Sequence, residues 1–459
     1  MLAQNVTIRG KAHASYAGKI IKLYAARDYI TNMKNLEAID TIASDGFFEL
    51  NWHSPVTRPV SLKIGNVVAN LFVQPDFVYG ITIPEVEKNL DYNNDAELPV
   101  NIGIVGADST ELNVLTYDYQ DLYNTLFAPA DGRYLSRAAM FGQADSLKRI
   151  SDKRFAAIGN VYFKNYVFYS IASVNASVSR GENFLVKSYI TGRPIQYHNN
   201  EYMQFFNTCF KGYLNTVAAS HKGQTLYNII NAKASYPLLC DFLKEDKLIA
   251  SDSLRELVIL KNLWDFYFNP EFAQESIESI VTQLSMQTRI AEHQAICRNM
   301  LAFFKKMEPG SVAPDFSARN RNGKIASLGS FKNKWVYLNF FSTNKTESLK
   351  EMPKIAALKK KYGDKVVFIS VCVDDSLKAY NDYLKANPKF DWNILFNNTK
   401  GLSKTAKDNY NVTGSEAYFL VDNKGYLAMS PALSPSQGIE YRFNIIFKVR
   451  QRNTRTGIR

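Results

Sequence analysis

Residues 335–353 read Trp-Val-Tyr-Leu-Asn-Phe-Phe-Ser-Thr-Asn-Lys-Thr-Glu-Ser-Leu-Lys-Glu-Met-Pro, and this stretch decides the fold of the C-terminal part of the chain. Residues 336–341 are mostly apolar or aromatic, as in an interior strand of a sheet that is covered on both faces. A helical pattern follows at once and ends near Gly363. Asn344 is the predicted N-cap of this helix, and Glu347 stands three residues later, as in a capping box. The stretch therefore predicts a buried strand followed directly by a helix.

Two short motifs of this stretch match a known pattern. Asn-Phe-Phe-Ser-Thr occupies residues 339–343, and Glu-Met-Pro occupies residues 351–353. They resemble the active-site segment of the thioredoxin-like TlpA/ResA-type disulfide reductases and AhpC/TSA redoxins. That segment reads strand, Asn-Phe-Trp-Ala-Thr-Trp-Cys-x-x-Cys, and then a helix with Glu-Met-Pro. The two cysteines of the pattern are missing here, since Lys345 and Ser348 occupy their places.

The resemblance extends over residues 310–429 and implies a thioredoxin-like α/β domain. Residues 412–422 resemble the segment that carries a cis-proline beside the cysteines, and Glu416 stands at the proline position. In this family the groove beside the cysteines recognises extended polypeptide. The alignment implies that the groove is lined here by Phe341, Asn344, Lys345, Ser415 and Glu416.

The missing cysteines limit the chemistry. Thiol–disulfide exchange needs an attacking thiolate and a second thiol that resolves the mixed disulfide, and peroxide reduction needs the same thiolate. Neither Lys345 nor Ser348 can form a disulfide, and no catalytic base stands near either of them in the sequence. The sequence therefore predicts a redox-inactive scaffold or protein-binding module that needs no cofactor.

Two other functions stay open at this stage. The chain is a thiol-disulfide or peroxide oxidoreductase if Cys372 or a cysteine of the helical region replaces the lost pair. Alternatively, the N-terminal part is a carbohydrate- or lipid-facing adhesion module and the remainder is a spacer. Rapid alkylation of a cysteine in the native protein even at mildly acidic pH would favour the oxidoreductase, because it indicates a thiol of low pKa.

Composition indicates a folded protein of two to four domains. The chain has 459 residues, 46% of them hydrophobic and 21% charged, and no apolar run that could cross a bilayer. The net charge is +12, and residues 448–459 form a basic tail without acidic residues. This tail has no interleaved aromatic residues and no nucleic-acid motif, so we expect a solvated terminus and no nucleic-acid partner.

Cysteines and histidines show no spacing that is typical of a site. Cys209, Cys240, Cys297 and Cys372 include no close pair, so burial as small apolar side chains is expected, with a Cys209–Cys240 disulfide as the alternative. The five histidines are scattered, and neither a metal site nor a histidine-based triad is predicted.

The whole chain is predicted to be a multidomain α+β protein. Residues 1–118 show period-two runs between turn signals, which predict an antiparallel β-sandwich that includes strands over residues 98–105 and 111–117. The order of these motifs resembles the DUF4369-type domain that precedes redoxin domains in envelope proteins of Bacteroidetes. Residues 119–308 are predicted to form a helical domain, and residues 309–447 the thioredoxin-like domain with a closing hairpin and helix.

Helix signals in the middle region are clear, but no catalytic constellation accompanies them. A helical apolar face spans residues 155–169, and Ser253 with Glu256 forms a capping box that opens another helix. Asn269-Pro270 opens a third helix, and residues 197–200 read as a polar turn or part of a groove. Aromatic residues at helical spacing in this region indicate core packing.

The N-terminus and the resemblance together suggest where the protein works. Met-Leu-Ala-Gln at residues 1–4 has neither a charged nor an apolar segment of a signal peptide, yet it resembles the tail of a truncated one. The resemblance implies a periplasmic or cell-envelope protein whose partner is an extended polypeptide or another envelope protein.

Overall fold

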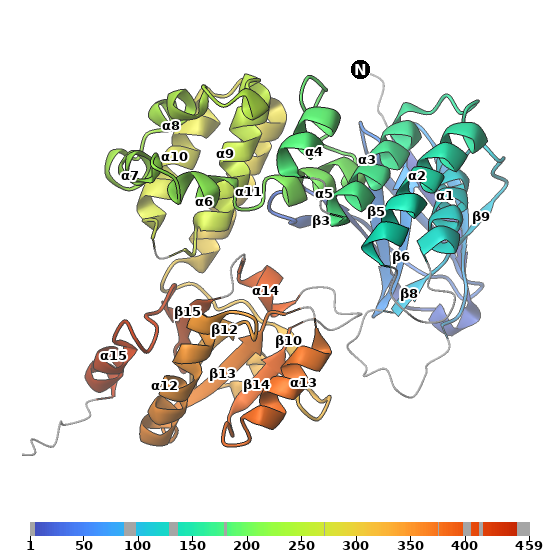
Figure 1. Ribbon diagram of the computed structural model, residues 1–459. Coiled ribbons are helices and arrows are strands. Elements are labelled where there is room, and N and C mark those ends of the chain that lie inside the picture. Colours follow the sequence, from blue (N-terminus) through green and yellow to red (C-terminus); the bar gives the residue numbers. More distant parts are fainter. Residues whose placement is uncertain are drawn as a thin grey trace, which may run out of the picture. The chain divides into compact units, whose positions relative to one another are not determined.

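The computed structural model describes residues 5–86, 98–127, 136–178, 181–269, 271–374, 376–397, 405–412 and 416–447. Ser415 and the basic tail therefore lie outside the described residues. The chain divides into two compact units: Met1–Trp264 with Glu275–Leu301, and Asp265–Gln274 with Ala302–Arg459. Figure 1 labels many of the elements of both units.

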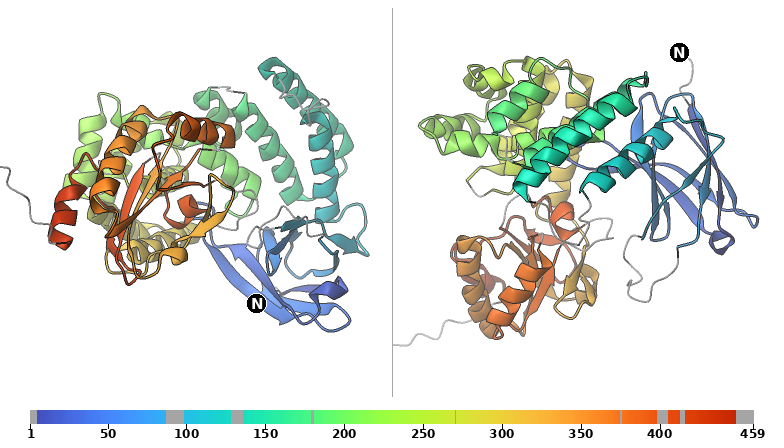
Figure 2. Two further views of the ribbon diagram at one scale, coloured as in Figure 1. Left: turned by 90° about the horizontal axis from the view of Figure 1, so that it is seen from below. Right: turned by 45° about the vertical axis from the view of Figure 1, so that its right-hand side comes forward.

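The N-terminal part of the first unit is a β-sandwich of a four-stranded and a five-stranded sheet, ordered β4-β1-β7-β9 and β3-β2-β5-β6-β8. Alternate residues of each strand point into one shared core, which includes Ile8, Leu23 and Leu50. Most neighbouring strands are antiparallel, but β1 pairs with β7, and β6 with β8, in parallel. Figure 2 shows these strands in blue to cyan. The strands are β1 (Asn5–Ala12), β2 (Ile20–Ala26), β3 (Lys34–Thr41), β4 (Phe47–His53), β5 (Arg58–Ile64), β6 (Val67–Val73), β7 (Val78–Ile83), β8 (Leu98–Val100) and β9 (Gly103–Val105).

The strand predicted over residues 111–117 is wrong, because helix α1 (Leu112–Phe127) begins there. Glu111 accounts for the difference, since its carboxylate accepts the backbone N–H groups of Asn113 and Val114 at 2.8 and 3.0 Å. These are among the donors that the first turn of a helix leaves unpaired. A glutamate directly before the helix thus supplies a cap where alternating apolar residues resemble a strand.

Helices make up the rest of the first unit, and the sandwich packs against them. The Asn113 side chain bonds both backbone groups of Phe72 on β6, and the Phe72 ring contacts the rings of Tyr162 and Tyr166 at 5.8 and 5.5 Å. The helices are α2 (Arg137–Arg154), α3 (Val161–Ser177), α4 (Glu182–Tyr189), α5 (Asn200–Cys209), α6 (Tyr213–Ala218), α7 (Gly223–Tyr227), α8 (Tyr236–Leu243), α9 (Asp252–Phe266), α10 (Gln274–Gln287) and α11 (Ala291–Met307), of which the ends of α9 and α11 and the first residue of α10 belong to the second unit.

Three predicted helix starts differ from the structure. Helix α3 is capped by the Asn160 side chain, so Phe155 lies in the preceding turn and not on this helix. Helix α9 begins at Asp252, and Glu256 does not return to its N-terminus but faces other helices. Helix α10 begins at Gln274, four residues beyond Pro270, which lies outside the described residues.

The second unit contains a seven-stranded sheet ordered β11-β10-β14-β13-β12-β15-β16. Strand β12 is interior, parallel to β13 and antiparallel to β15, and it confirms the buried strand predicted over residues 336–341. The strands are β10 (Ser317–Asn320), β11 (Ile325–Ser327), β12 (Trp335–Phe341), β13 (Val366–Cys372), β14 (Asn393–Phe396), β15 (Ala417–Val421) and β16 (Leu427–Met429). The helices include α12 (Thr346–Tyr362), α13 (Leu377–Ala386), α14 (Ala406–Asn409) and α15 (Ile439–Ile446).

Both faces of this sheet are covered, as the apolar sequence of β12 predicts. Tyr337 on one face contacts the ring of Phe443 of α15 at 5.5 Å, and Phe340 on the other face contacts the ring of Tyr410 at 5.8 Å.

Polar side chains also bond within the sheet. Ser370 donates to Asn339 Oδ1 at 2.5 Å and accepts from Trp392 Nε1 at 2.8 Å, and all three side chains are buried. These bonds satisfy polar groups that would otherwise destabilise the core.

Candidate functional site

The turn between β12 and α12 carries the residues that the resemblance singled out. Helix α12 begins at Thr346, with Lys345 at the N-cap position and no hydrogen bond from its side chain to the helix. Asn344 is therefore not the cap that the sequence predicted. Its backbone N–H instead donates to Ser342 Oγ at 3.1 Å, within the turn that precedes the helix. Asn344 and Lys345 are both exposed.

Asp374, which follows β13, holds this turn in place. Its carboxylate accepts from Ser342 Oγ at 2.5 Å and from the backbone N–H of Thr343 at 2.8 Å, and it also accepts from the Thr343 hydroxyl. Burial alone would raise the pKa of Asp374, but the bonds from Ser342 and Thr343 outweigh it and lower the pKa below its ordinary value. Sequence reasoning missed Asp374, and its only signal was an acidic residue just after a buried strand.

Ser348 and Glu416 come together at this turn. Ser348 is 1% exposed, its Oγ accepts the backbone N–H of Ser342 at 3.2 Å, and it is hydrogen bonded to the Glu416 side chain. Glu416 directly precedes β15, whose Ala417 pairs with Phe340 of β12. The position predicted for the missing proline thus lies beside one of the positions predicted for the missing cysteines.

Glu416 has an unusual environment for a carboxylate. Its Oε1 is buried and makes no hydrogen bond to the part of the chain that the structure describes. Burial, followed by the negative charges of Glu351 and Glu347, raises the pKa of Glu416, and the bond with Ser348 only partly offsets this. A carboxylate with a raised pKa and an unpaired oxygen binds a proton more readily than an ordinary surface carboxylate.

Phe341 does not face an open groove. The side chain is 1% exposed and packs against the ring of Tyr383 at 5.8 Å. It lies on the same face of the sheet as Tyr337, because side chains alternate between the two faces along β12. Helices cover this face, so the Phe341 ring is buried. Ser415, the fifth residue predicted to line the groove, is not among the described residues.

The Glu-Met-Pro motif serves the packing of α12. Glu351 accepts from the backbone N–H of Ser436 at 2.9 Å and from its hydroxyl, and Lys354 Nζ lies 2.9 Å from the same carboxylate. Met352 is fully buried in the core of the unit. The motif therefore fixes the loop that leads to α15.

All four cysteines are free, and the Cys209–Cys240 disulfide does not form. Cys372 ends β13 with no exposed surface, and its Sγ lies 3.5 Å from Asp374 Oδ2. Burial, reinforced by the Asp374 charge, raises the pKa of the Cys372 thiol to about 12. This thiol stays protonated near neutral pH, so it lacks the thiolate that redox chemistry requires.

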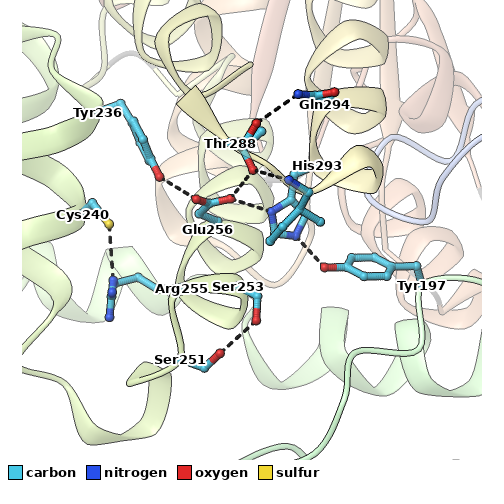
Figure 3. Close-up of polar contacts among 11 residues, drawn as sticks. Tyr197, Tyr236, Cys240, Ser251, Ser253, Arg255, Glu256, Thr288, His293 and Gln294 are labelled. Atoms are coloured by element: carbon cyan, nitrogen blue, oxygen red, sulfur yellow. Dashed lines mark hydrogen bonds and ion pairs between the residues drawn. The ribbon is translucent and has the colours of Figure 1, made fainter. Parts of the chain in front are cut away.

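The helices of the first unit contain a polar cluster that the sequence did not reveal (Figure 3). His293 of α11 places Nδ1 2.8 Å from Glu256 Oε2 and Nε2 2.8 Å from the Tyr197 hydroxyl. Thr288 and Tyr236 also donate to the Glu256 carboxylate, at 2.6 and 2.9 Å. Since a carboxylate only accepts, His293 carries its proton on Nδ1 when neutral, and Nε2 accepts from Tyr197.

The order carboxylate, imidazole, hydroxyl in this cluster resembles a relay that activates a nucleophile, but other observations weigh against one. His293 has no exposed surface, and burial followed by the charges of Glu292 and Glu256 raises the pKa of the Tyr197 hydroxyl. An activated hydroxyl needs the opposite shift. We therefore interpret the cluster as a structural connection between α8, α9, α11 and the segment before α5.

Metal and membrane features are not seen in the described parts of the chain. Within these parts, no three histidine, cysteine, aspartate or glutamate side chains gather where they could hold a metal ion. None of the helices described has the length and apolar character required to span a membrane.

Comparison with known protein families places a similarity in the second unit. The protein family described as Thioredoxin-like matches residues 333–427. Thioredoxin-like protein YneN of Bacillus subtilis is 29% identical over 122 residues, which are 26% of this chain and 69% of YneN. Thiol-disulfide oxidoreductase ResA of Bacillus thuringiensis subsp. konkukian is 34% identical over 124 residues, which are 26% of this chain and 68% of ResA.

Two solved structures are also similar. A thioredoxin-like protein from Bacteroides caccae is 16% identical with a TM-score of 0.33, and the match covers 52% of this chain and 92% of that one. A thiol:disulfide interchange protein from Bacteroides sp. is 18% identical with a TM-score of 0.28, and the match covers 32% of this chain and 95% of that one.

Proposed function

Because this chain belongs, through its second unit, to the thioredoxin-like family of the ResA thiol-disulfide oxidoreductases, we propose that it keeps the fold of that family without its redox chemistry. It acts as a binding module for an extended polypeptide or another envelope protein. The turn that carries chemistry in a redox-active relative serves here as a recognition surface.

One observation carries this proposal. The first turn of α12 presents Lys345 and Ser348, three residues apart, where thiol exchange needs two cysteines. Their environments differ, since Lys345 is exposed and Ser348 is buried against Ser342 and Glu416. Neither side chain can attack a disulfide or take part in a mixed disulfide with a partner that approaches the turn.

The same turn retains features that suit binding. Asn344 and Lys345 are exposed and free to contact a partner, and Glu416 Oε1 lacks a donor among the described residues. Exposed polar side chains such as Asn344 and Lys345 can bond the backbone groups of an extended polypeptide. Asp374 keeps the turn rigid through its bonds to Ser342 and Thr343, which lowers the entropic cost of binding.

We also assign the protein to the periplasm or cell envelope. This assignment rests on the resemblance of residues 1–118 to the DUF4369-type domain and of residues 310–429 to the envelope redoxins. The corresponding division, predicted with a sandwich over residues 1–118, places the end of the sandwich at residue 111 because helix α1 begins at Leu112. A helical domain then extends to residue 308, followed by a thioredoxin-like domain over 309–447 and a basic tail.

The competing function is an oxidoreductase that uses Cys372. This residue ends the strand beside β12, where its backbone pairs with Phe341, so its position is close to the turn. Its lack of exposure and its raised pKa weigh against it, because a substrate disulfide must reach a thiolate.

Insulin reduction with dithiothreitol tests the proposal. We expect no acceleration by the natural protein and clear acceleration by the variant Lys345→Cys with Ser348→Cys, because the pair restores a Cys-x-x-Cys sequence at a helix N-terminus. Lys345→Cys alone is the matched control and should stay inactive, since it has no resolving thiol. Activity of the natural protein that disappears in Cys372→Ser would favour the oxidoreductase and overturn the proposal.

A further inference from the structure

A cavity of about 280 Å³ lies in the first unit, between α2, α3 and the C-terminal end of α4. Its volume is just below the range for drug-sized small-molecule sites, roughly 300–1,000 Å³, so it suits a smaller ligand. It belongs to the helical part of the chain and shares no residue with the turn before α12. An inference about this cavity is therefore independent of the function proposed for that turn.

The walls of the cavity are mainly apolar, and their aromatic side chains are held by packing. Phe155 and Phe163 meet edge to face with ring centroids 4.9 Å apart, and Phe168 contacts Tyr189 at 5.1 Å. Tyr189 is itself fixed by Asn175, which donates to its hydroxyl at 3.0 Å. Because its walls are anchored in this way, the cavity is a preformed apolar site.

A buried hydroxyl marks the interior of this site. Ser151 of α2 lines the cavity and is 2% exposed, yet its Oγ has no hydrogen-bond partner among the described residues. Buried hydroxyl groups are normally paired, because leaving one unpaired is unfavourable. A ligand with an oxygen atom would supply the missing partner.

The charges of the cavity lining favour an anion. Lys148 forms an ion pair with Asp152, so these two side chains neutralise one another. Lys164 of α3 also lines the cavity, is exposed, and has no ion pair in the described portion of the chain. One positive charge is thus left beside an apolar cavity.

From these observations we propose that the cavity binds a small monocarboxylate with an apolar chain or ring. The apolar part packs against Phe163 and Phe168, while the carboxylate accepts from Lys164 and Ser151. Each additional methylene contributes about a fourfold gain in affinity until the cavity is full.

Octanoate binding to the full chain, measured by calorimetry, tests the proposal, with 1-octanol as the uncharged probe of equal chain length. We expect saturable binding of one octanoate, tighter than octanol, with a preference that decreases as sodium chloride is added. Lys164→Gln should weaken octanoate about threefold and leave octanol unchanged. Ser151→Ala should weaken octanoate about fivefold. Lys222→Gln, at an exposed lysine outside the cavity lining, is the matched control and should change neither affinity.

Val167→Trp fills the cavity and should abolish binding of both probes, because Val167 is part of the lining. Circular dichroism establishes whether this variant is folded. Should it not fold, the Lys164→Gln comparison decides alone, because that side chain is exposed. Absence of saturable octanoate binding, or an octanoate affinity that Lys164→Gln leaves unchanged, would overturn the proposal.

Discussion

At the scale of single residues, the environments of the four thiols set their reactivity. Cys209, Cys297 and Cys372 are buried, whereas Cys240 is partly exposed. We expect iodoacetamide at pH 8 to label Cys240 first in the native protein and the other three only in urea, because alkylation needs an accessible thiolate. Peptide mass spectrometry identifies the labelled residue. The variant Cys240→Ser should take up little label when folded, and rapid labelling of Cys372 in it would contradict the buried environment described here.

The Glu256 carboxylate offers a second residue-scale prediction. Both oxygens of the Glu256 carboxylate accept hydrogen bonds. In Glu256→Gln one of these oxygens becomes an N–H₂ group, which is a donor and faces another donor. We therefore expect a loss of about 2 kcal/mol in unfolding free energy. Urea denaturation measures this change. Glu275→Gln, at an exposed position of α10, is the control and should stay within about 0.5 kcal/mol of the natural protein.

Glu256 also predicts a pH dependence. Burial would raise its pKa, but hydrogen bonds from His293, Thr288 and Tyr236 outweigh burial and lower the pKa below the ordinary value of 4.5. Such a carboxylate contributes stability above its unfolded-state pKa, and this contribution is lost as the pH falls through the folded-state pKa. Denaturation below pH 4.5 should therefore show a steeper loss of stability in the natural protein than in Glu256→Gln. Equal slopes would show that the cluster does not bind the carboxylate form preferentially.

At the scale of elements, Asn113 joins helix α1 to strand β6. Its Oδ1 accepts the Phe72 N–H at 2.6 Å and its Nδ2 donates to the Phe72 carbonyl at 2.9 Å. The partner strand β8 pairs with β6 only as far as Ala69, so it cannot replace these bonds. We expect Asn113→Ala to lower the unfolding free energy by about 2 kcal/mol, measured in urea. Asp121→Ala, at an exposed site on α1, should change it little.

The sequence predicted elements well where periodicity and local signals agreed. The apolar run before Ser342 produced β12, and Asp422 with Gly425 formed the turn of the β15–β16 hairpin. The prediction failed where a side chain serves a distant partner. Glu256 stands at capping-box spacing from Ser253, but its carboxylate bonds His293, 37 residues away. No local pattern encodes such a contact, because it depends on how α9 and α11 pack.

The candidate site could also be predicted only where local sequence motifs marked its residues. Lys345 and Ser348 were located because they interrupt a recognisable local motif, and Glu416 because it stands at the proline position of a second one. Asp374 and its bonds to Ser342 were not predicted, since they join the ends of two neighbouring parallel strands. The three-dimensional order of strands was required to see that the turn is held from β13.

At the scale of the whole molecule, sandwich and helices of the first unit share contacts and should unfold together. Asn207 donates to the Tyr29 carbonyl at 2.7 Å, and Asn299 of α11 donates to Asp28 at 2.7 Å. We expect Asn113→Ala, at the sandwich, and Glu256→Gln, among the helices, to lower the midpoint temperature of the same calorimetric transition. Shifts of two different transitions would show that sandwich and helices unfold separately.

The bonds of Ser370 to Asn339 and Trp392 bear on how the central sheet avoids mispairing while it folds. A two-residue slip of β13 along β12 would place Phe368 or Cys372 opposite Asn339. Both are apolar and on the same face, so hydrophobic matching alone scarcely penalises the slip. It would, however, leave the buried Asn339 amide without the Ser370 hydroxyl. Misaligned intermediates are thus made short-lived by one buried polar contact between the two strands.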